Sequence, residues 1–210
     1  MGKKVILVTP PLTKEERYGT HAAAGSELPP FALCNLAAVL SKENIGVKII
    51  DAPSCGYNLK DIYNIITDYD PNIVGITSVT ISISHAAEVA RYIKQKGYKA
   101  PIVLGGPHLT AVPEETFKRF KQFDIGVIGE GEYTFLDLVQ KWKEGVDLNS
   151  IPGLVFRSNG HIIFSSKRPF IENLDELPMP RWDLLPNFPK GYSSSALRFK
   201  QYPSACLITS

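Results

Sequence analysis

Continuous apolar runs rich in β-branched residues constrain the fold of this chain more than any other feature. They do not alternate with polar residues, so each is expected to form a strand covered on both faces, as in a parallel sheet. The runs lie at residues 4–9, 47–50, 73–78, 102–104 and 125–128.

Segments with helical spacing separate these runs. Proline or asparagine marks several helix starts, at Pro30, Asn58 and Pro113. Strand–helix units this short, all within residues 1–147, require right-handed crossovers. We therefore predict an α/β fold: a Rossmann-like, doubly wound sheet of five parallel strands in the flavodoxin-like order 2-1-3-4-5. The helical segments lie at residues 31–44, 59–68, 85–96, from 113 onward, and at 132–143.

The sequence pattern changes after this alternation of strands and helices. Two short β runs, 153–157 and 161–165, flank an Asn-Gly turn and predict a β-hairpin annex over residues 148–166. Prolines interrupt every run from residue 168 onward, which indicates an extended connector over 167–210. Its apolar residues are too many for a flexible linker, so it should pack against a surface.

The composition excludes several classes of protein. Hydrophobic residues make up 44% and charged residues 21% of the chain, which is typical of a globular protein. Lys and Arg number 23 against 21 for Asp and Glu, too balanced for a surface that follows nucleic-acid phosphates. No apolar run approaches the roughly 18 residues of a membrane span, and no signal segment is evident. We expect a cytoplasmic protein with neither nucleic acid nor membrane as a partner.

Small and hydroxyl-bearing residues follow the predicted strands, where the ligand crevice of an open α/β sheet lies. Glycines at this edge allow a ligand to approach the backbone, although they could equally serve only to make tight turns. The predicted cofactor-binding residues are Pro10, Pro11, Thr77, Ser78, Thr80, Gly105, Gly106, His108, Gly129, Glu130, Gly131 and Glu132. Glu130 and Glu132 could act in acid–base chemistry, but capping of the next helix or hydrogen bonding to ligand amides is favoured.

Common cofactor motifs are absent. A dinucleotide site would need GxGxxG after the first strand, where Thr9, Pro10 and Pro11 stand, and the same residues disfavour a flavin-binding flavodoxin. The GK[ST] of a phosphate-binding P-loop does not occur. The histidines never pair at metal-ligand spacing, so we predict no metal site and no catalytic residue in this chain. They are His21, His85, His108 and His161.

Six segments occur in an order that is more specific than any one of them. They are 30–40 (PFALCNLAAVL), 71–77 (PNIVGIT), 104–110 (LGGPHLT), 129–135 (GEGEYTF), 151–155 (IPGLV) and 174–184 (LDELPMPRWDL). In this order the chain resembles the cobalamin-binding radical S-adenosylmethionine (SAM) proteins, a group with methyltransferases and anaerobic magnesium-protoporphyrin monomethyl ester cyclases. The resemblance implies a cobalamin domain over residues 1–147, followed by the connector to a radical SAM barrel of the same full-length chain.

The resemblance also implies what these residues do not hold. Cys206–Ser210 looks like the first barrel strand, stopping before the CxxxCxxC loop, so the [4Fe-4S] cluster and SAM are expected only in the full-length protein. The DxHxxG motif, which supplies an imidazole ligand to cobalt in some cobalamin domains, is lacking. His21 and Gly25 come nearest, but no Asp lies two residues before His21. Cobalamin is therefore expected without that histidine.

Two functions follow from these observations. The first is a cobalamin-binding module of a radical SAM enzyme that performs methyl transfer or a tetrapyrrole-type cyclisation. The alternative is a docking domain that has lost cobalamin binding and shapes access of the substrate. Nothing in the loops separates the two.

The cysteines generate a first prediction. Cys34, Cys55 and Cys206 lie in different segments, whereas a cluster needs grouped thiolates. Anaerobic reconstitution of this chain with iron and sulfide should leave no stoichiometric charge-transfer absorption in the visible spectrum. A stable product with one cluster per chain would contradict the prediction.

Overall fold

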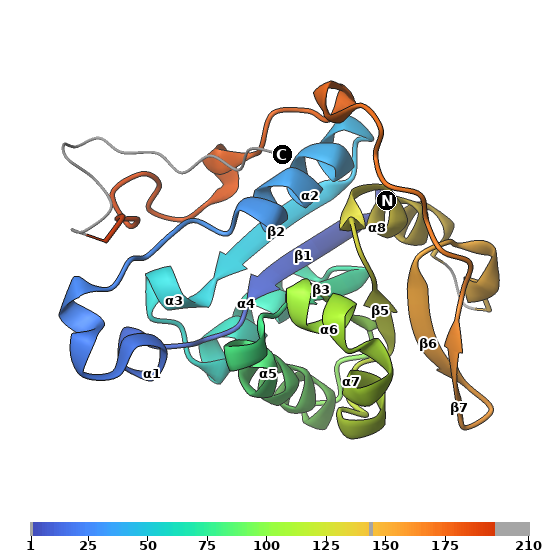
Figure 1. The fold of residues 1–210 in the computed structure, drawn as a ribbon, viewed down its shortest axis with the longest axis horizontal. Helices are drawn as coiled ribbons and strands as arrows, with labels where there is room; N and C mark the ends of the chain where they lie inside the picture. Colours follow the sequence, from blue (N-terminus) through green and yellow to red (C-terminus); the bar gives the residue numbers. More distant parts are fainter. Residues whose placement is uncertain (1, 143–144, 196–210) are drawn as a thin grey trace.

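The computed structural model describes residues 2–142 and 145–195. One seven-stranded sheet, in the order β2-β1-β3-β4-β5-β6-β7, forms the centre of the protein (Figure 1). The strands are β1 (Lys4–Thr9), β2 (Gly46–Asp51), β3 (Ile73–Thr77), β4 (Ile102–Gly105), β5 (Ile125–Val127), β6 (Leu154–Ser158) and β7 (His161–Phe164). Strands β1 to β5 are parallel, and their order 2-1-3-4-5 confirms the prediction.

The predicted helices are present, with ends that differ by about two residues at most. Three short helices, α1, α3 and α6, were not predicted. The helices are α1 (Lys14–Tyr18), α2 (Phe31–Lys42), α3 (Ala52–Cys55), α4 (Leu59–Tyr69), α5 (Ile83–Gln95), α6 (Pro107–Ala111), α7 (Pro113–Arg119) and α8 (Gly131–Lys141).

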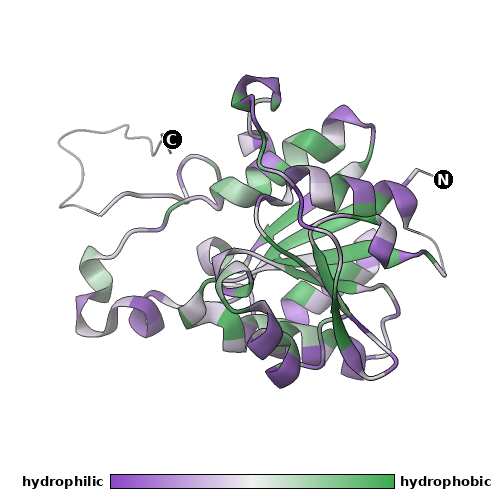
Figure 2. Cartoon of the chain, turned by 45° about the vertical axis from the view of Figure 1, so that its right-hand side comes forward, coloured by the Kyte–Doolittle hydropathy of each residue, from purple (hydrophilic) through white to green (hydrophobic). Residues whose placement is uncertain are grey.

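Alternate residues of β1 fill two separate cores. Val5 and Leu7 pack with α2 and α8 on one face of the sheet, and Ile6 and Val8 pack with α4 and α5 on the other. All four are buried. Full burial of such a side chain stabilises the fold by about 1.5–3 kcal/mol. Figure 2 shows the result, with hydrophobic strands inside and hydrophilic stretches on the outer helices.

Local capping fixes two helix starts. The Asn58 side chain accepts hydrogen bonds from the backbone N–H of Lys60 at 2.8 Å and of Asp61 at 3.1 Å, which begins α4 as predicted. Thr13 and Glu16 form a reciprocal capping box at the start of α1. The Thr-x-x-Glu spacing of that box is visible in the sequence and would have predicted α1.

The hairpin is present, but it is not an annex beside the sheet. Strand β6 pairs antiparallel with β5, and β7 pairs with β6, so the hairpin extends the same sheet. Burial explains the difference, because Leu154 and Phe156 point into the core under α8 and Val155 into the opposite one. The edge strand of the parallel sheet is thereby covered.

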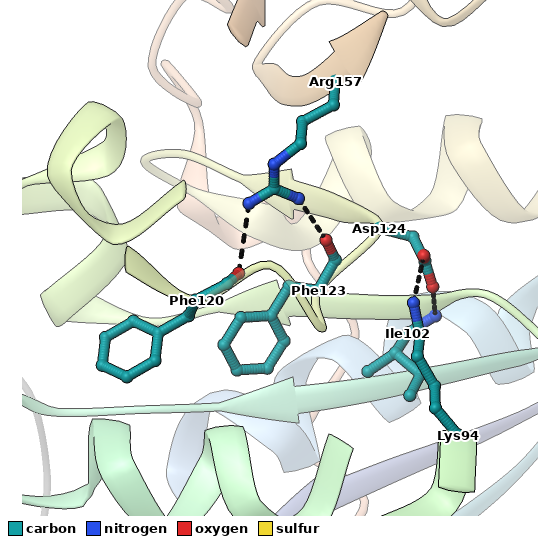
Figure 3. Close-up of polar contacts among 6 residues, drawn as sticks. All are labelled: Lys94, Ile102, Phe120, Phe123, Asp124 and Arg157. Atoms are coloured by element: carbon teal, nitrogen blue, oxygen red, sulfur yellow. Dashed lines mark hydrogen bonds and ion pairs between the residues drawn. The ribbon is translucent and has the colours of Figure 1, made fainter. Parts of the chain in front are cut away.

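Arg157 of β6 ties the hairpin to α7 (Figure 3). Its guanidinium donates to the carbonyl oxygens of Phe123 at 2.8 Å and Phe120 at 3.1 Å, and also to that of Phe117. These carbonyls lie at and beyond the C-terminal end of α7, where a cation is favoured by the helix dipole. Asp124 makes a second junction close by, accepting from the backbone N–H of Ile102 at 2.8 Å and from Lys94.

The connector packs along α2, as its apolar content required (Figure 1). Its backbone N–H at Arg181 donates to the carbonyl of Cys34 at 3.1 Å, and the ring of Trp182 lies 5.5 Å from that of Phe31. Leu185 is buried in the core under α2. Cys34 is likewise a buried residue of α2.

The last described part of the connector is fixed to the carboxyl end of β2. The Tyr192 hydroxyl donates to Asp51 at 2.9 Å and lies 3.2 Å from the hydroxyl of Ser54. Ser193 and Glu27 exchange backbone hydrogen bonds of 2.8 and 2.9 Å. Asp51 and Glu27 are both buried, and burial is the main cause that raises the pKa of each carboxyl.

The C-terminal segment and the lengths of the helices bear on two further expectations. The expected barrel strand Cys206–Ser210 lies outside the described residues. Within the described residues, no helix is both long and apolar enough to cross a membrane.

The buried Asp51 generates a prediction on pH. A carboxyl whose pKa is higher in the folded protein favours the folded state when protonated, so stability should fall as pH rises from the ordinary value of 3.8 through the folded pKa. Asp51→Asn should weaken this fall, as measured by urea unfolding from pH 4 to 7. The exposed Asp68→Asn is the control and should retain the wild-type profile. An unchanged profile in Asp51→Asn would contradict the assignment.

Candidate functional site

A cavity of about 570 Å³ opens at the carboxyl ends of β3, β4 and β5. Its walls combine apolar side chains from the sheet, α2 and α8 with polar groups at the end of β3, in α6 and around the start of α8. The apolar residues include Leu7, Leu33, Leu36, Val103, Val127 and Phe135, and the polar ones are Thr77, Thr110, Glu130 and Glu132. Such a mixture suits a ligand with a large apolar part and a few hydrogen-bonding groups.

The structure brings together most of the predicted site residues. Those that line the cavity are Thr77, Gly105, Gly106, Gly129, Glu130, Gly131 and Glu132. Those outside its lining are Pro10, Pro11, Ser78, Thr80 and His108. The two prolines follow β1, on the half of the edge where Tyr192 of the connector binds the end of β2.

Ser78 lies beside the cavity and ties β3 to β4. Its backbone N–H donates to the carbonyl of Gly105 at 3.0 Å, and its carbonyl accepts from the N–H of His108 at 3.3 Å. Its hydroxyl is buried and has no hydrogen-bond partner among the described residues. A buried hydroxyl of this kind normally has a partner, so it is a candidate for bonding a ligand or water.

His108 faces Thr80. Its Nδ1 lies 3.2 Å from the Thr80 hydroxyl, and burial lowers the pKa of the imidazole, which favours the neutral form at pH 7. No group of three or more His, Cys, Asp or Glu side chains in the described part of the chain could hold a metal ion. His21 is exposed on the turn after α1.

Gly105 and Gly106 are adjacent but serve different purposes. A Cβ at Gly105 would meet no atom within 4 Å, so its Cα faces open space where the residue lines the cavity. A Cβ at Gly106 would lie 2.5 Å from the carbonyl oxygen of Ser78, and the residue has φ +98°. Gly106 is therefore required by the packing of β3 against the start of α6, whereas Gly105 leaves room for a ligand.

The two glutamates at the cavity, Glu130 and Glu132, also have different surroundings. Glu130 makes no side-chain cap on α8; its carboxylate instead accepts a hydrogen bond from the backbone N–H of Ile171 at 2.7 Å. Glu132 lies in the first turn of α8, where burial, and then the charge of Glu130, raise the pKa of its carboxyl. The raised pKa shifts Glu132 toward the protonated form, in which a carboxyl can donate as well as accept a hydrogen bond.

Comparison with known proteins identifies the family. The family model described as the B12 binding domain matches residues 19–139, which include helices α2 to α7, strands β2 to β5 and most of α8. The chain belongs to the B12-binding domain family. B12 is cobalamin, so the match agrees with the resemblance found in the sequence.

The relatives of this B12-binding domain are longer proteins. An uncharacterised methyltransferase of Pyrococcus horikoshii is 39% identical over 87% of this chain and 39% of its own length. The anaerobic magnesium-protoporphyrin IX monomethyl ester cyclase of Rubrivivax gelatinosus is 30% identical over 80% of this chain and 32% of its own length. The chain thus spans about a third of the length of these proteins.

Solved structures share the fold of this domain. The radical SAM methyltransferase TsrM of Kitasatospora setae, solved with cobalamin and a [4Fe-4S] cluster, matches 86% of this chain and 31% of its own, with a TM-score of 0.65 and 22% identity. The cobalamin-dependent SAM radical enzyme OxsB, solved with aqua-cobalamin and SAM, matches 85% of this chain and 24% of its own, with a TM-score of 0.68 and 21% identity.

Sequence reasoning missed the apolar walls of the cavity in this domain. Leu7 lies in a predicted strand and Leu33 and Phe135 lie in predicted helices, and nothing in their spacing separates a cavity wall from a filled core. Gly75 carried a usable signal, because a glycine inside a strand often marks a close approach. A Cβ there would lie 3.0 Å from Leu7 and 3.2 Å from Phe135.

The two adjacent glycines generate a prediction on stability. Gly106→Ala should lower the free energy of unfolding by more than about 1 kcal/mol, because it forces a Cβ against Ser78 at a positive φ. Gly105→Ala is the matched control and should cost less, since its Cβ enters open space. Urea unfolding of the two variants measures the difference. Equal losses would contradict the distinction between these positions.

Proposed function

We propose that this domain binds cobalamin in the cavity at the ends of β3, β4 and β5. The observation that carries the proposal is the pairing of open space above Gly105 with a buried, unpartnered hydroxyl at Ser78, among the residues that the structure describes. Cobalamin is a wide ring fringed with amides and has a nucleotide tail. Such a ligand needs a site where it can approach the protein backbone without meeting bulky side chains, and it needs a few hydrogen-bonding groups. This edge of the sheet supplies both.

Different residues of the cavity would make different contacts with the ligand. Gly105, Gly129 and Gly131 expose backbone to the ligand, and the apolar walls cover its less polar parts. Thr77 and Glu132 offer hydrogen bonds at the cavity, and Ser78 and Thr80 offer them beside it. Pro10 and Pro11 lie outside the cavity lining and would stiffen the loop after β1. The bound cobalamin would supply cobalt chemistry to a partner active site.

Cobalt is proposed to receive no ligand from a histidine of this domain. His108 is directed to Thr80 and does not line the cavity, and His21 is exposed without the Asp of a DxHxxG motif. Removal of the His108 imidazole should therefore leave the cobalt environment unchanged.

The full-length protein is proposed to be a cytoplasmic radical SAM enzyme. Its methyltransferase and cyclase relatives support either methyl transfer or a tetrapyrrole-type cyclisation as the reaction. Residues 1–147 would present cobalamin, 148–166 would extend the sheet, and 167–210 would lead to the barrel that holds the [4Fe-4S] cluster and SAM. The radical SAM barrel of the same chain is the proposed partner, with no role for nucleic acid or membrane.

Cobalamin retention tests the proposal. Purified protein mixed with hydroxocobalamin and desalted should keep about one cobalamin per chain, seen in the visible spectrum. Gly105→Leu should weaken binding at least about tenfold, or about 1.4 kcal/mol, because the side chain fills the open space. Gly105→Ala should bind better than Gly105→Leu, and His108→Ala should bind with an unshifted spectrum.

The outcomes separate the competing functions. Circular dichroism would establish that each variant is folded. Folded wild-type protein that keeps no cobalamin would refute binding and leave the docking domain as the function. A loss or a spectral shift in His108→Ala, with Gly105→Leu still binding, would mean that His108 ligates cobalt.

A further inference from the structure

We propose that Glu130 is a positioning residue that holds residues 167–171 across the mouth of the cavity, so that Phe170 covers the bound ligand. We call residues 167–171 the strap. This inference rests on the proposed binding of cobalamin, and it assigns to the connector a direct part in that binding.

Phe170 connects the strap with the cavity. It lies far along the chain from the loops that follow β3, β4 and β5, yet it lines the same cavity. The residue is 70% exposed, so most of its apolar ring surface is available to a ligand. Lys167 of the same strap lies over the ring at 5.6 Å from its centre. An aromatic ring at the rim of a pocket can cover the flat part of a ligand with little loss of side-chain freedom.

Two contacts fix the strap. Glu130 lies between β5 and α8, lines the cavity itself, and accepts the hydrogen bond of the Ile171 backbone N–H at 2.7 Å. Arg168 forms an ion pair with Asp137 of α8. Hydrogen bonds to charged groups are stronger than neutral ones. The carboxylate of Glu130 is therefore a strong acceptor for the backbone N–H of the strap.

The position of Phe170 depends on these links. It lies between Arg168 and Ile171, so the backbone is held on both sides of it while its side chain is not buried. Loss of the Glu130 carboxylate frees one end of the strap and lets Phe170 move from the mouth. A looser strap would speed release of the ligand more than it would alter folding, because the strap contributes no strand and no buried core residue.

Matched variants separate this role from a general effect of charge. Glu130→Ala removes the acceptor, whereas Glu130→Gln retains an oxygen that can accept from Ile171. Phe170→Ala removes the cover and leaves Glu130 in place. Glu172→Ala is the control, because it deletes an exposed carboxylate one residue beyond the link.

The experiment measures release of hydroxocobalamin. The full 210-residue chain and its variants are loaded, desalted, and desalted again at timed intervals while bound cobalamin is read from the visible spectrum. Glu130→Ala and Phe170→Ala should release it about tenfold faster than wild type. Glu130→Gln should release it more slowly than Glu130→Ala, because it retains a neutral acceptor for the Ile171 N–H, and Glu172→Ala should stay close to wild type. Hydrogen exchange at the Ile171 amide should slow on loading in wild type and not in Glu130→Ala.

The possible results bear on the two proposals separately. Wild-type protein that takes up cobalamin, with Phe170→Ala and Glu130→Ala releasing it at the wild-type rate, would overturn the strap alone. Wild-type protein that takes up none would overturn the proposed function and the strap with it. If Glu130→Ala fails to fold, Phe170→Ala decides the question, since the exposed ring can be removed without opening the core.

Discussion

A parallel sheet must be covered on both faces, and β1, which lies between β2 and β3, shows how completely the molecule depends on this requirement. Neighbouring residues of β1 enter opposite cores, so helices must lie on both sides of the strand. Right-handed crossovers then bring the carboxyl ends of all parallel strands to one edge. The candidate site lies among the loops at that edge, where the ligands of open α/β sheets bind.

The connector divides this edge into two halves. At the β2 end, Tyr192 binds Asp51 and the adjoining loop pairs Glu27 with Ser193, so this half is closed by protein groups. At the β3 to β5 end the loops are short and rich in glycine, and the cavity opens there. The same connector therefore stabilises one half of the edge and, through the strap, forms a wall of the site in the other half.

Neighbouring residues with the same side chain differ in role because their surroundings differ. Gly105 faces the cavity, and Gly106 faces the backbone of Ser78. Glu130 accepts a hydrogen bond from the strap, and Glu132 lines the cavity and has a carboxyl with a raised pKa. A motif such as Gly-Gly or Gly-Glu-Gly-Glu thus combines one position that is fixed by contacts within the fold with another that is open to the cavity.

The sequence by itself determined the fold class, the strand order and the edge of the sheet that carries the candidate site. These depend on local properties, namely the apolar runs, the helix starts at Pro30 and Asn58, and the handedness of short crossovers. The ordered motifs also identified the cobalamin family. Seven of the predicted binding residues therefore line the cavity.

Only the tertiary structure decided how distant segments meet. Arg157 joins the hairpin to the end of α7, Tyr192 reaches Asp51, and Phe170 reaches the cavity, each over a separation that no local pattern encodes. The open space at Gly105 and the crowding at Gly106 likewise depend on what lies opposite each Cα. Propensity and periodicity describe one segment at a time, whereas contacts across the fold depend on how all segments pack together.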